Sequence, residues 1–287
     1  MKKLIILIVS SLIGLMIGFQ SLSAETAAEK GLSIMQSIEK LPAIEKMLSR
    51  TTLNIYDAQG KKLYSRKSRM AAYTLNYNNP DLRLSRSIAY FYAPSDYKGN
   101  ASLSIEMKDE DDKQWIYMKG LRKPKKVVGS DKSSSFMGSD FSNGDIAPRD
   151  INDYNYRWLG TEKIKFKTKT LKVEKIESSF KKQQNQEDYG YSKAVVWVHK
   201  SSGLAFKMEM YNLDGQLSKK ARLLSFMTKK NRDGKKVFIS TGLEMKNVLK
   251  GTKTVMLINS KSIKVEKAAG NIKADIFKES YLTRRWW

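Results

Sequence analysis

The stretch from Trp115 to Asp145 concentrates the residues of this sequence that could do chemistry. Serine, aspartate and glycine gather there, and these residue types can supply nucleophiles, carboxylates and tight backbone turns. A strand-like run, Trp115–Met118, leads through a basic connection, Arg122–Gly129, into a polar loop, Ser133–Asp145. This stretch is therefore the first place to look for an active site.

The loop Ser133–Asp145 also carries aromatic side chains. Phe136 and Phe141 flank Gly138 and Asp140, so both rings can insert into an apolar interior while serine and aspartate side chains bond to their own backbone. Two interpretations stay open. The loop is either a structural plug that ties itself to the scaffold or a lid over the mouth of a cavity.

The usual catalytic groups are missing from the sequence. His199 is the single histidine, it stands beside Lys200 at the end of a predicted strand, and there is no cysteine. Zinc sites and histidine-based nucleophilic triads therefore lack their ligands and bases. No phosphate-binding loop, dinucleotide fingerprint or nucleophile elbow is present. We predict no catalytic residue, no cofactor and no enzyme activity.

The acidic run Asp109–Asp112 offers the oxygen ligands that Ca²⁺ prefers. It lies in a predicted hairpin turn, where a solvated loop tip is the better interpretation. The later aspartates do not fit a calcium loop either, because Phe141 falls where a ligand is needed. We therefore predict no metal site.

Composition and charge describe a basic globular protein. The 287 residues are 41% hydrophobic and carry a formal net charge of +24. The lysines are spread along the chain and form no dense block, which favours a generally basic surface over a nucleic-acid-reading stripe. Anionic lipid and acidic proteins remain possible partners, and nucleic acid is not expected.

The N-terminus has the pattern of a cleavable signal peptide, residues 1–24. Lys2 and Lys3 precede an uncharged run, Leu4–Phe19, and small residues follow up to Ala24. A retained membrane anchor is the alternative, although the run is rather short for a span. Because the chain has no cysteine, a lipid-modified N-terminal cysteine and disulfides are excluded. Export without disulfides suits a periplasmic protein.

Helical spacing occupies the start of the mature chain and strand spacing the rest. We expect a helix in residues 25–49 that Pro42 interrupts, with Ile44, Met47 and Leu48 in a short second helix. Short runs with two-residue alternation, divided by Asp-Gly turns, then predict one large antiparallel sheet and a mainly β (α+β) fold. The expected strands are 51–57, 61–70, 86–92, 103–107, 114–118, 156–159, 163–176, 193–199, 204–210, 217–228, 237–245 and 252–265.

The apolar faces of these strands are rich in methionine and aromatic residues. A packed sandwich core more often uses Val, Ile and Leu, whereas methionine adapts to a variable surface. An ordinary core and a sheet curled around an apolar ligand are both compatible with this composition. No internal repeat or linker divides the chain, so residues 25–287 are expected to form a single domain.

The central motif closely resembles the LolA-like outer-membrane lipoprotein-sorting proteins, in particular a larger branch that accompanies transporters of the resistance-nodulation-division (RND) type. Matching residues also occur at both flanks of the motif. Two positions depart from the family pattern: Lys119-Gly120 replaces Pro-Ala, and Asn143-Gly144 replaces Tyr-Glu. The residues that carry the resemblance are Phe91, Pro94, Gly99, Leu103, Asp111, Trp115–Tyr117, Leu121–Lys123, Ser135–Ser142, Asp145, Ile276, Phe277, Tyr281 and Leu282.

The resemblance implies a half-open antiparallel barrel whose N-terminal helix and loops close an apolar concave side. It implies a non-enzymatic periplasmic carrier of lipid or lipoprotein acyl chains that works with an inner-membrane RND-type transporter. Gly138, Ser139, Asp140 and Asp145 would then shape the loop. The expected cavity and lid residues are Leu103, Ile105, Met107, Trp115, Tyr117, Leu121, Phe136, Met137, Phe141, Trp158, Trp197, Phe206 and Met208.

Two other functions remain as alternatives. A basic β-rich periplasmic adaptor could bind an anionic membrane or an envelope protein through its surface without carrying cargo. A hydrolase is disfavoured by the missing catalytic groups. The C-terminal Arg284–Trp287 could dock on the barrel or on a membrane interface, because basic and aromatic residues suit both.

Overall fold

A computed structural model describes residues 25–270 and 272–286 of the chain. The predicted signal peptide lies outside these residues. Helix α1 (Ala27–Glu39) opens the described chain and begins with a capping box, in which Thr26 and Glu29 satisfy each other's backbone N–H groups. Two shorter helices follow, α2 (Asn143–Ile146) and α3 (Gln183–Tyr189). The predicted first helix is thus confirmed, and it ends three residues before Pro42.

Strands make up most of the regular secondary structure of the described chain. The strands are β1 (Lys46–Tyr56), β2 (Lys62–Leu75), β3 (Leu84–Ala93), β4 (Ala101–Ile105), β5 (Lys113–Tyr117), β6 (Pro124–Lys126), β7 (Tyr154–Phe166), β8 (Lys169–Phe180), β9 (Lys193–His199), β10 (Leu204–Tyr211), β11 (Leu217–Lys230), β12 (Lys236–Asn247), β13 (Lys253–Ile258) and β14 (Lys264–Val265).

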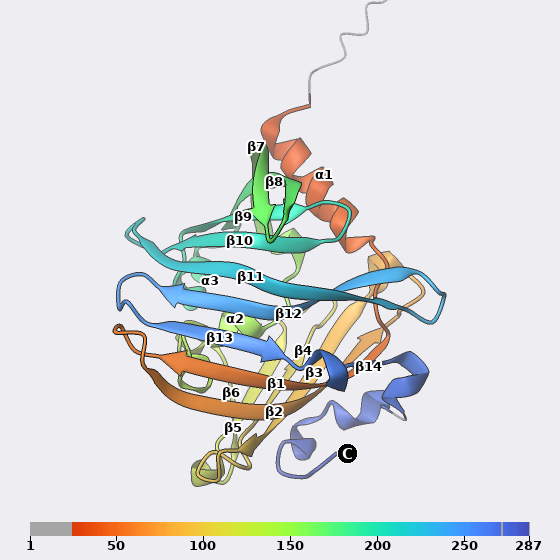
Figure 1. Cartoon of the computed structure of the whole chain (residues 1–287), viewed down its shortest axis with the longest axis vertical. Helices are drawn as coiled ribbons and strands as arrows, with labels where there is room; N and C mark the ends of the chain where they lie inside the picture. Colours follow the sequence, from red (N-terminus) through yellow and green to blue (C-terminus); the bar gives the residue numbers. More distant parts are fainter. Residues whose placement is uncertain (1–24, 271, 287) are drawn as a thin grey trace, which may run out of the picture.

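All these strands join one 14-stranded antiparallel sheet, in the order β6-β5-β4-β3-β2-β1-β13-β12-β11-β10-β9-β8-β7, with β14 beside β1. Within the described chain β6 and β7 end this path and are not paired with each other. The sheet is strongly curved, so that β3 to β6 lie behind β12, β13, β1 and β2 in Figure 1. The expected open, curved antiparallel sheet is therefore confirmed.

Three details of the expected strand map are wrong. Met47 and Leu48 belong to β1 and pair with β2 and β14, so cross-strand pairing overrides their helical spacing. Residues 163–176 are not one strand, because a turn at Lys167, with φ of 55°, separates β7 from β8. Residues 252–265 are also interrupted, since β13 ends at Ile258 and a 3₁₀ turn precedes β14. Helix α3 was not expected.

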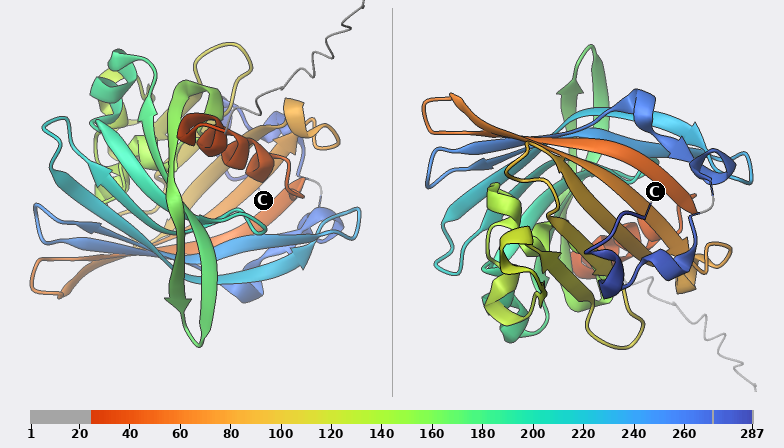
Figure 2. Two further views of the ribbon diagram at one scale, coloured as in Figure 1. Left: turned by 90° about the horizontal axis from the view of Figure 1, so that it is seen from above. Right: turned by 90° about the horizontal axis from the view of Figure 1, so that it is seen from below.

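The two faces of the sheet have different covers (Figure 2). Helix α1 packs Ile34 against Ile176, Val196 and Val198 on the concave face. On the convex face, the C-terminal segment, residues 272–286, inserts Phe277 and Leu282 among side chains of β2 to β4. The remaining part of the concave face is covered by the motif loop described below.

Candidate functional site

The motif loop, Ser133–Asp145, folds back on itself over the concave face. Ser135 and Ser142 form an isolated antiparallel bridge, and the backbone N–H of Phe136 donates to the carbonyl oxygen of Phe141 at 2.7 Å. Between them, Met137 and Gly138 adopt left-handed backbone conformations with φ of 52° and 66°. This tight turn directs the apolar side chains of the loop in one direction, into the molecule.

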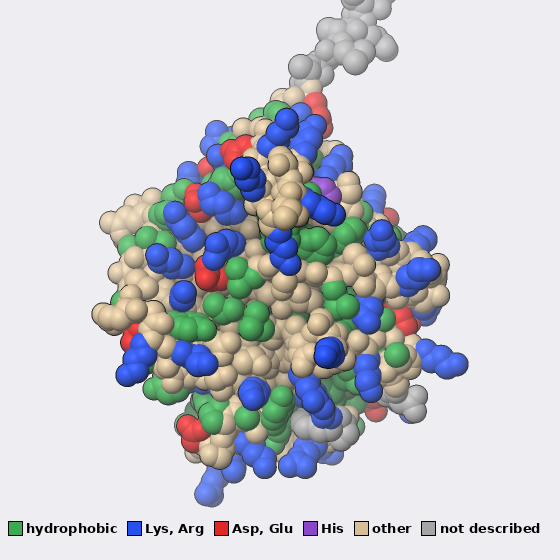
Figure 3. All heavy atoms as spheres, in the orientation of Figure 1, with side chains coloured by type: hydrophobic (Ala, Val, Ile, Leu, Met, Phe, Trp, Pro, Cys, Tyr) green, Lys and Arg blue, Asp and Glu red, His purple; other side chains and the backbone are tan. Residues whose placement is uncertain are grey.

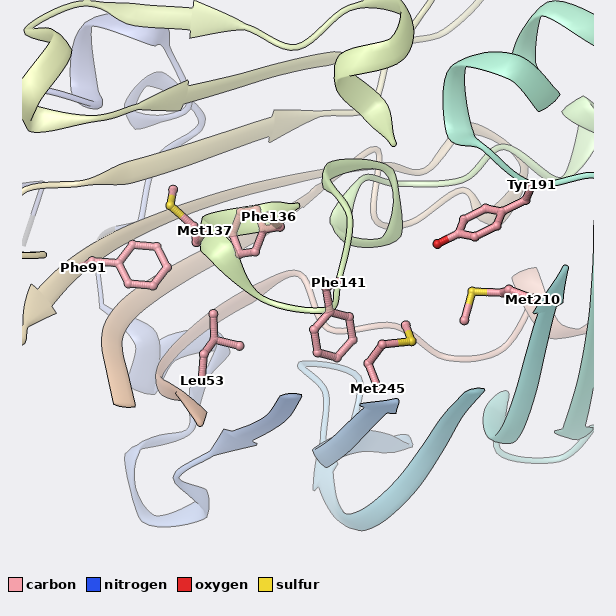
Figure 4. Packing of buried hydrophobic residues seen from close by; sticks show 8 residues of the cluster. All are labelled: Leu53, Phe91, Phe136, Met137, Phe141, Tyr191, Met210 and Met245. Atoms are coloured by element: carbon pink, nitrogen blue, oxygen red, sulfur yellow. The ribbon is translucent and has the colours of Figure 1, made fainter. Parts of the chain in front are cut away.

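The apolar side of the loop meets a floor rich in methionine. Phe136, Met137 and Phe141 are each 4% exposed and pack with Leu53 and Phe91 (Figure 4). We call the sheet residues beneath them the methionine floor, because unbranched thioether side chains dominate it. The floor contains Met118, Met208, Met210, Met245 and Met256.

Asp140 joins the motif loop to the start of β13. Its carboxylate accepts hydrogen bonds from the hydroxyl groups of Thr252 and Thr254, the latter at 2.7 Å. Its backbone N–H donates to Thr254 Oγ1 at 2.9 Å. The tip of the loop is therefore attached to the sheet through one aspartate and two threonines.

Asp145 provides a second attachment. Its carboxylate is 3% exposed and accepts from Lys219 Nζ on β11 at 3.1 Å, and it lies 3.7 Å from Arg149 Nη2. The hydroxyl of Tyr191 also donates to it, at 3.2 Å. Burial, followed by the charge of Asp145, raises the pKa of Tyr191 above its usual range, so the phenol stays protonated as a donor. Asp145 also caps α2 by accepting from the backbone N–H of Ser142.

Arg66 lies beneath the turn of the motif loop. Its guanidinium is 4.1 Å from the ring centroid of Tyr97, and its Nη1 atom is buried without a hydrogen-bond partner. A Cβ atom at Gly138 would stand 2.8 Å from that nitrogen, and φ there is positive, so a larger residue would displace the arginine. The Tyr97 hydroxyl in turn lies 3.2 Å from the sulfur of Met137.

The altered pair Asn143-Gly144 still supports the loop. The side-chain amide of Asn143 donates to the Asp131 carbonyl at 2.8 Å, and Gln114 donates to the carbonyl of Asn143 at 3.0 Å. A Cβ atom at Gly144 would stand 2.4 Å from the ring of Tyr189. The ring of Tyr189 on α3 thus takes up space that any larger residue at position 144 would need.

Part of the predicted cavity lining does lie on the concave side. Phe136, Met137, Phe141 and Met208 meet in the cluster around the motif loop. Trp158 on β7 packs under α1 with Ile34, where the ammonium of Lys30 lies 3.4 Å from its ring centroid.

Other predicted lining residues face the convex side, and their assignment to the cavity is corrected. Leu103, Ile105, Trp115 and Tyr117 pack under the C-terminal segment, in a cluster separate from the motif loop. Alternation shows that these residues share a face, but it does not tell which face is concave. Their neighbours Ser102, Ser104 and Ile116 occupy the motif-loop side.

Trp197 and Phe206 also lie apart from the motif loop. They pack in a third cluster with Val173 on β8 and Leu223 on β11. Trp197 alternates with Val196 and Val198, which contact α1, and therefore faces away from that helix. Its indole N–H donates to Glu162 at 2.7 Å.

Two further residues of the predicted cavity lining, Leu121 and Met107, do not line an apolar cavity. Leu121 is 63% exposed in the connection between β5 and β6. Met107 borders a cavity of about 410 Å³ whose lining is mostly polar and includes Asp109–Asp112, Asp150 and Asp153. The acidic run borders this cavity, while Asp109, Glu110 and Asp111 remain exposed, as expected for a solvated tip. Burial raises the pKa of Asp112 there to about 6.

Sequence reasoning missed several residues that meet the motif loop. Phe91 was noted only as part of the resemblance, and Leu53, Tyr191, Met210 and Met245 were not assigned to the site. The strand alternation of Phe91, Leu53, Met210 and Met245 was visible, but alternation does not identify the residues that meet across the sheet. Thr252, Thr254 and Lys219 carried no signal at all, because their role depends on contacts with residues more than 70 positions away.

A family model described as an uncharacterized protein matches residues 83–284. The chain belongs to this family. A search of curated proteins finds no match.

Three solved structures of bacterial proteins share the fold. An outer membrane lipoprotein-sorting protein domain from Vibrio parahaemolyticus is 24% identical with a TM-score of 0.75, over 90% of this chain and 100% of its own. A DUF1329 family protein from Desulfovibrio piger is 22% identical with a TM-score of 0.75, over 90% of this chain and 99% of its own. A LolA superfamily protein from Nitrosomonas europaea is 19% identical with a TM-score of 0.60, over 88% of this chain and 98% of its own. The resemblance to LolA-like proteins is thereby confirmed for the fold.

The helices of residues 25–270 and 272–286 include none that is both long and apolar enough to cross a membrane.

Proposed function

We propose that this protein is a non-enzymatic periplasmic carrier that shields lipid or lipoprotein acyl chains from water. The observation that carries the proposal is the apolar contact between the motif loop and the methionine floor. Phe136, Met137 and Phe141 occupy the concave side as an acyl chain would, and they belong to a loop that is separate from the sheet. Movement of this loop would free an apolar site of the same shape.

The energetics of an acyl chain explain why a carrier needs such a site. Each buried methylene contributes about 0.8 kcal/mol, so a lipid does not cross an aqueous compartment unaided. The site must also release its cargo, and flexible methionine side chains fit many chain shapes without the rigid complementarity of a branched core. The floor therefore suits reversible binding better than permanent packing.

The attachments of the loop are polar and few, which suits a lid. Asp140 binds two threonines, and Asp145 binds Lys219 and Tyr191. Water can replace such partners when the loop moves, so opening costs less than the exposure of an equal apolar contact area. Of the two interpretations of the loop, the lid is the one we adopt.

The RND-type transporter enters the proposal as the partner that loads or unloads the carrier. The resemblance of the central motif to the transporter-associated branch supports it. The fold shared with a lipoprotein-sorting domain supports acyl chains as the cargo.

Mass spectrometry of gently purified protein tests the carrier directly. We expect lipid to co-purify in stoichiometric amount and a fluorescent fatty acid to enter the delipidated protein. A ligand-free protein that also fails to take up the fatty acid would favour the adaptor instead. Salt separates these functions as well, because surface binding weakens steeply with ionic strength whereas acyl burial does not.

A further inference from the structure

The turn after β5 carries the most exposed leucine in the part of the chain that the structure describes. Leu121 is 63% exposed, although a leucine side chain gains free energy from burial. It ends a 3₁₀ turn, Lys119–Leu121, in which its backbone N–H donates to the carbonyl oxygen of Met118 at 2.9 Å. A hydrogen-bonded turn thus holds this apolar side chain in solvent.

Cationic side chains surround Leu121 along the chain. We call residues 119–126, which comprise the turn and β6, the cationic hairpin. The sequence has no acidic residue from Lys113 to Ser130. Among the described residues, only Asp131 forms an ion pair with a side chain of the cationic hairpin, that of Lys125 at 2.7 Å. The other charges are available to an anion from outside the chain. The exposed cationic residues are Lys119, Arg122, Lys123, Lys125 and Lys126.

Two other exposed leucines lie at the same end of the sheet. Leu213 follows β10 and is 52% exposed, and Leu249 follows β12 and is 60% exposed. Because neighbouring strands are antiparallel, the turns after β5, β10 and β12 share one end of the sheet. The tips after β10 and β12 project at the left in Figure 1. We call this end the leucine end, because it holds every described leucine that is more than half exposed.

The attachments of the motif loop lie at the leucine end as well. Asp140 binds Thr254 at the start of β13, and Asp145 binds Lys219 at the start of β11. Met118 of the methionine floor directly precedes the cationic hairpin. A surface that met the leucine end would therefore lie close to the place where the motif loop is attached.

The opposite end of the sheet presents charge without such leucines. The turn between β4 and β5 contains the acidic run Asp109–Asp112. The β7–β8 hairpin, which projects from the sheet in Figure 2, exposes Lys163 and Lys165, but its Ile164 and Phe166 pack against the sheet. Figure 3 shows basic side chains scattered over the whole visible face. Charge alone therefore does not distinguish the two ends, whereas charge combined with exposed leucine does.

An anionic bilayer fits both properties of the leucine end. Lysine and arginine side chains gain from the negative potential of anionic lipids, and an apolar side chain at a tip can insert below the head groups. The three leucines stand on separate turns and form no continuous patch like the apolar centre of a protein interface. A soft lipid surface accepts separate tips, whereas an acidic protein would pair with the charges and leave the leucines in water.

We propose that the leucine end docks on the surface of an anionic phospholipid bilayer, with Leu121 inserted among the lipids and the cationic hairpin at the head groups. The docking itself needs no cargo. Its consequence rests on the proposed carrier function: the attachments of the motif loop come close to the bilayer at which acyl chains enter or leave.

A fluorescent label at position 121 tests the insertion. Because the chain has no cysteine, Leu121→Cys and the control Leu82→Cys each accept a single environment-sensitive nitrobenzoxadiazole label. Leu82 is 39% exposed and lies between β2 and β3, at the opposite end of the sheet. With vesicles of phosphatidylcholine and phosphatidylglycerol in equal amounts, we expect a blue shift of the emission from position 121 only. Equal shifts at both positions, or none at 121, would overturn the docking.

Charge variants test the contact with head groups. In co-sedimentation with the same vesicles, Arg122→Gln/Lys123→Gln should weaken binding about thirtyfold. Lys163→Gln/Lys165→Gln removes the same charge at the opposite end and should weaken binding only about twofold. Vesicles of phosphatidylcholine alone should not bind. Equal losses in both double variants would show that net charge alone attracts the protein and would overturn the role of the leucine end.

Two further measurements separate this docking from a protein partner and from the carrier function. Polyglutamate serves as a probe for an acidic protein surface. If it binds in a manner that Arg122→Gln/Lys123→Gln abolishes, while anionic vesicles do not bind, the partner is a protein and membrane docking is overturned. Uptake of fatty acid from solution should be normal in this variant. Vesicle binding by an unaltered protein that takes up no fatty acid would refute the carrier and leave the docking supported.

Discussion

The motif loop and the C-terminal segment each cover one face of the sheet with buried apolar side chains. The residues that they contact are of different types. The C-terminal segment places Phe277 and Leu282, 2% and 0% exposed, among Ala71, Ile88 and Leu103. The motif loop places its rings on methionines and is attached by Asp140 and Asp145.

The different contacts of the two covers indicate a different function for each. Small and branched side chains pack as a rigid core, so the C-terminal segment gains from staying in place. Flexible methionine side chains can fill the space that a neighbouring side chain vacates. Separating the motif loop from the methionine floor should therefore cost less free energy than separating the C-terminal segment from its core. On our proposal, one sheet carries a permanent cover on its convex face and a movable one on its concave face.

The largest effect is expected at the permanent cover. Phe277→Ala should lower the free energy of unfolding by about 3–5 kcal/mol, because the cavity it leaves is lined by side chains that cannot collapse. Chemical denaturation measures the loss. Fatty-acid uptake by the folded fraction should be unchanged, and a loss of uptake there would break the contrast between the two covers.

A smaller loss of stability is expected at the movable cover. Phe136→Ala should cost about 1–2 kcal/mol, below the usual value for a buried ring, since Met137 and the floor can refill the space. The rate of fatty-acid release should change about tenfold, as stopped-flow fluorescence would show. An unfolding loss as large as that of Phe277→Ala with unchanged release would make the loop a structural plug.

The hydrogen bonds between Asp140 and Thr254, which attach the motif loop to β13, give a third comparison. Thr254 is fully buried, and Thr254→Val keeps its shape while it removes one donor and one acceptor for Asp140. We expect a stability loss of about 1 kcal/mol and faster fatty-acid uptake, because a closed loop is weakened more than an open one. Slower uptake would contradict a loop that opens by breaking this contact.

An effect confined to high pH is expected at Asp112, which neither cover contacts. Its pKa is raised by burial to about 6, so the folded state favours the protonated carboxyl and loses stability as pH rises from about 4 to about 6. Asp112→Asn should therefore stabilise the protein at pH 8, by about 1 kcal/mol after solvent screening, and should have little effect at pH 4. Urea midpoints at both pH values measure this, and a gain at pH 4 only would refute it.

The sequence could predict the sheet and the motif loop but not which faces meet. Two-residue alternation in Leu103 and Ile105 identified a strand with one apolar face, and the motif marked the loop whose Phe136 and Phe141 are buried. Alternation does not distinguish concave from convex, which is why Trp115 and Trp197 were assigned to the wrong side. Met47 and Leu48 fit helical spacing as well as strand spacing, and only pairing with β2 decides between them.

The attachments of the loop were beyond the reach of sequence patterns. Asp140 meets Thr252 and Thr254 across 112 and 114 residues, and the intervening chain forms most of the sheet. Such contacts depend on the register of every strand between them. Gly144 and Tyr189 illustrate the same limit, because a departure from the family pattern is explained only by a ring from another element.

The central claim is that the motif loop must leave the methionine floor for an acyl chain to enter. The chain has no cysteine, so Asp140→Cys/Thr254→Cys would introduce a single possible disulfide between two side chains that are in contact. Each single variant serves as a control for the lost hydrogen bonds.

Fatty-acid uptake by this double variant, measured in its oxidised and reduced forms, tests the claim most directly. We predict that the oxidised protein takes up no fluorescent fatty acid and that a reductant restores uptake to the level of the single variants. Equal uptake in the oxidised and reduced forms would contradict the account.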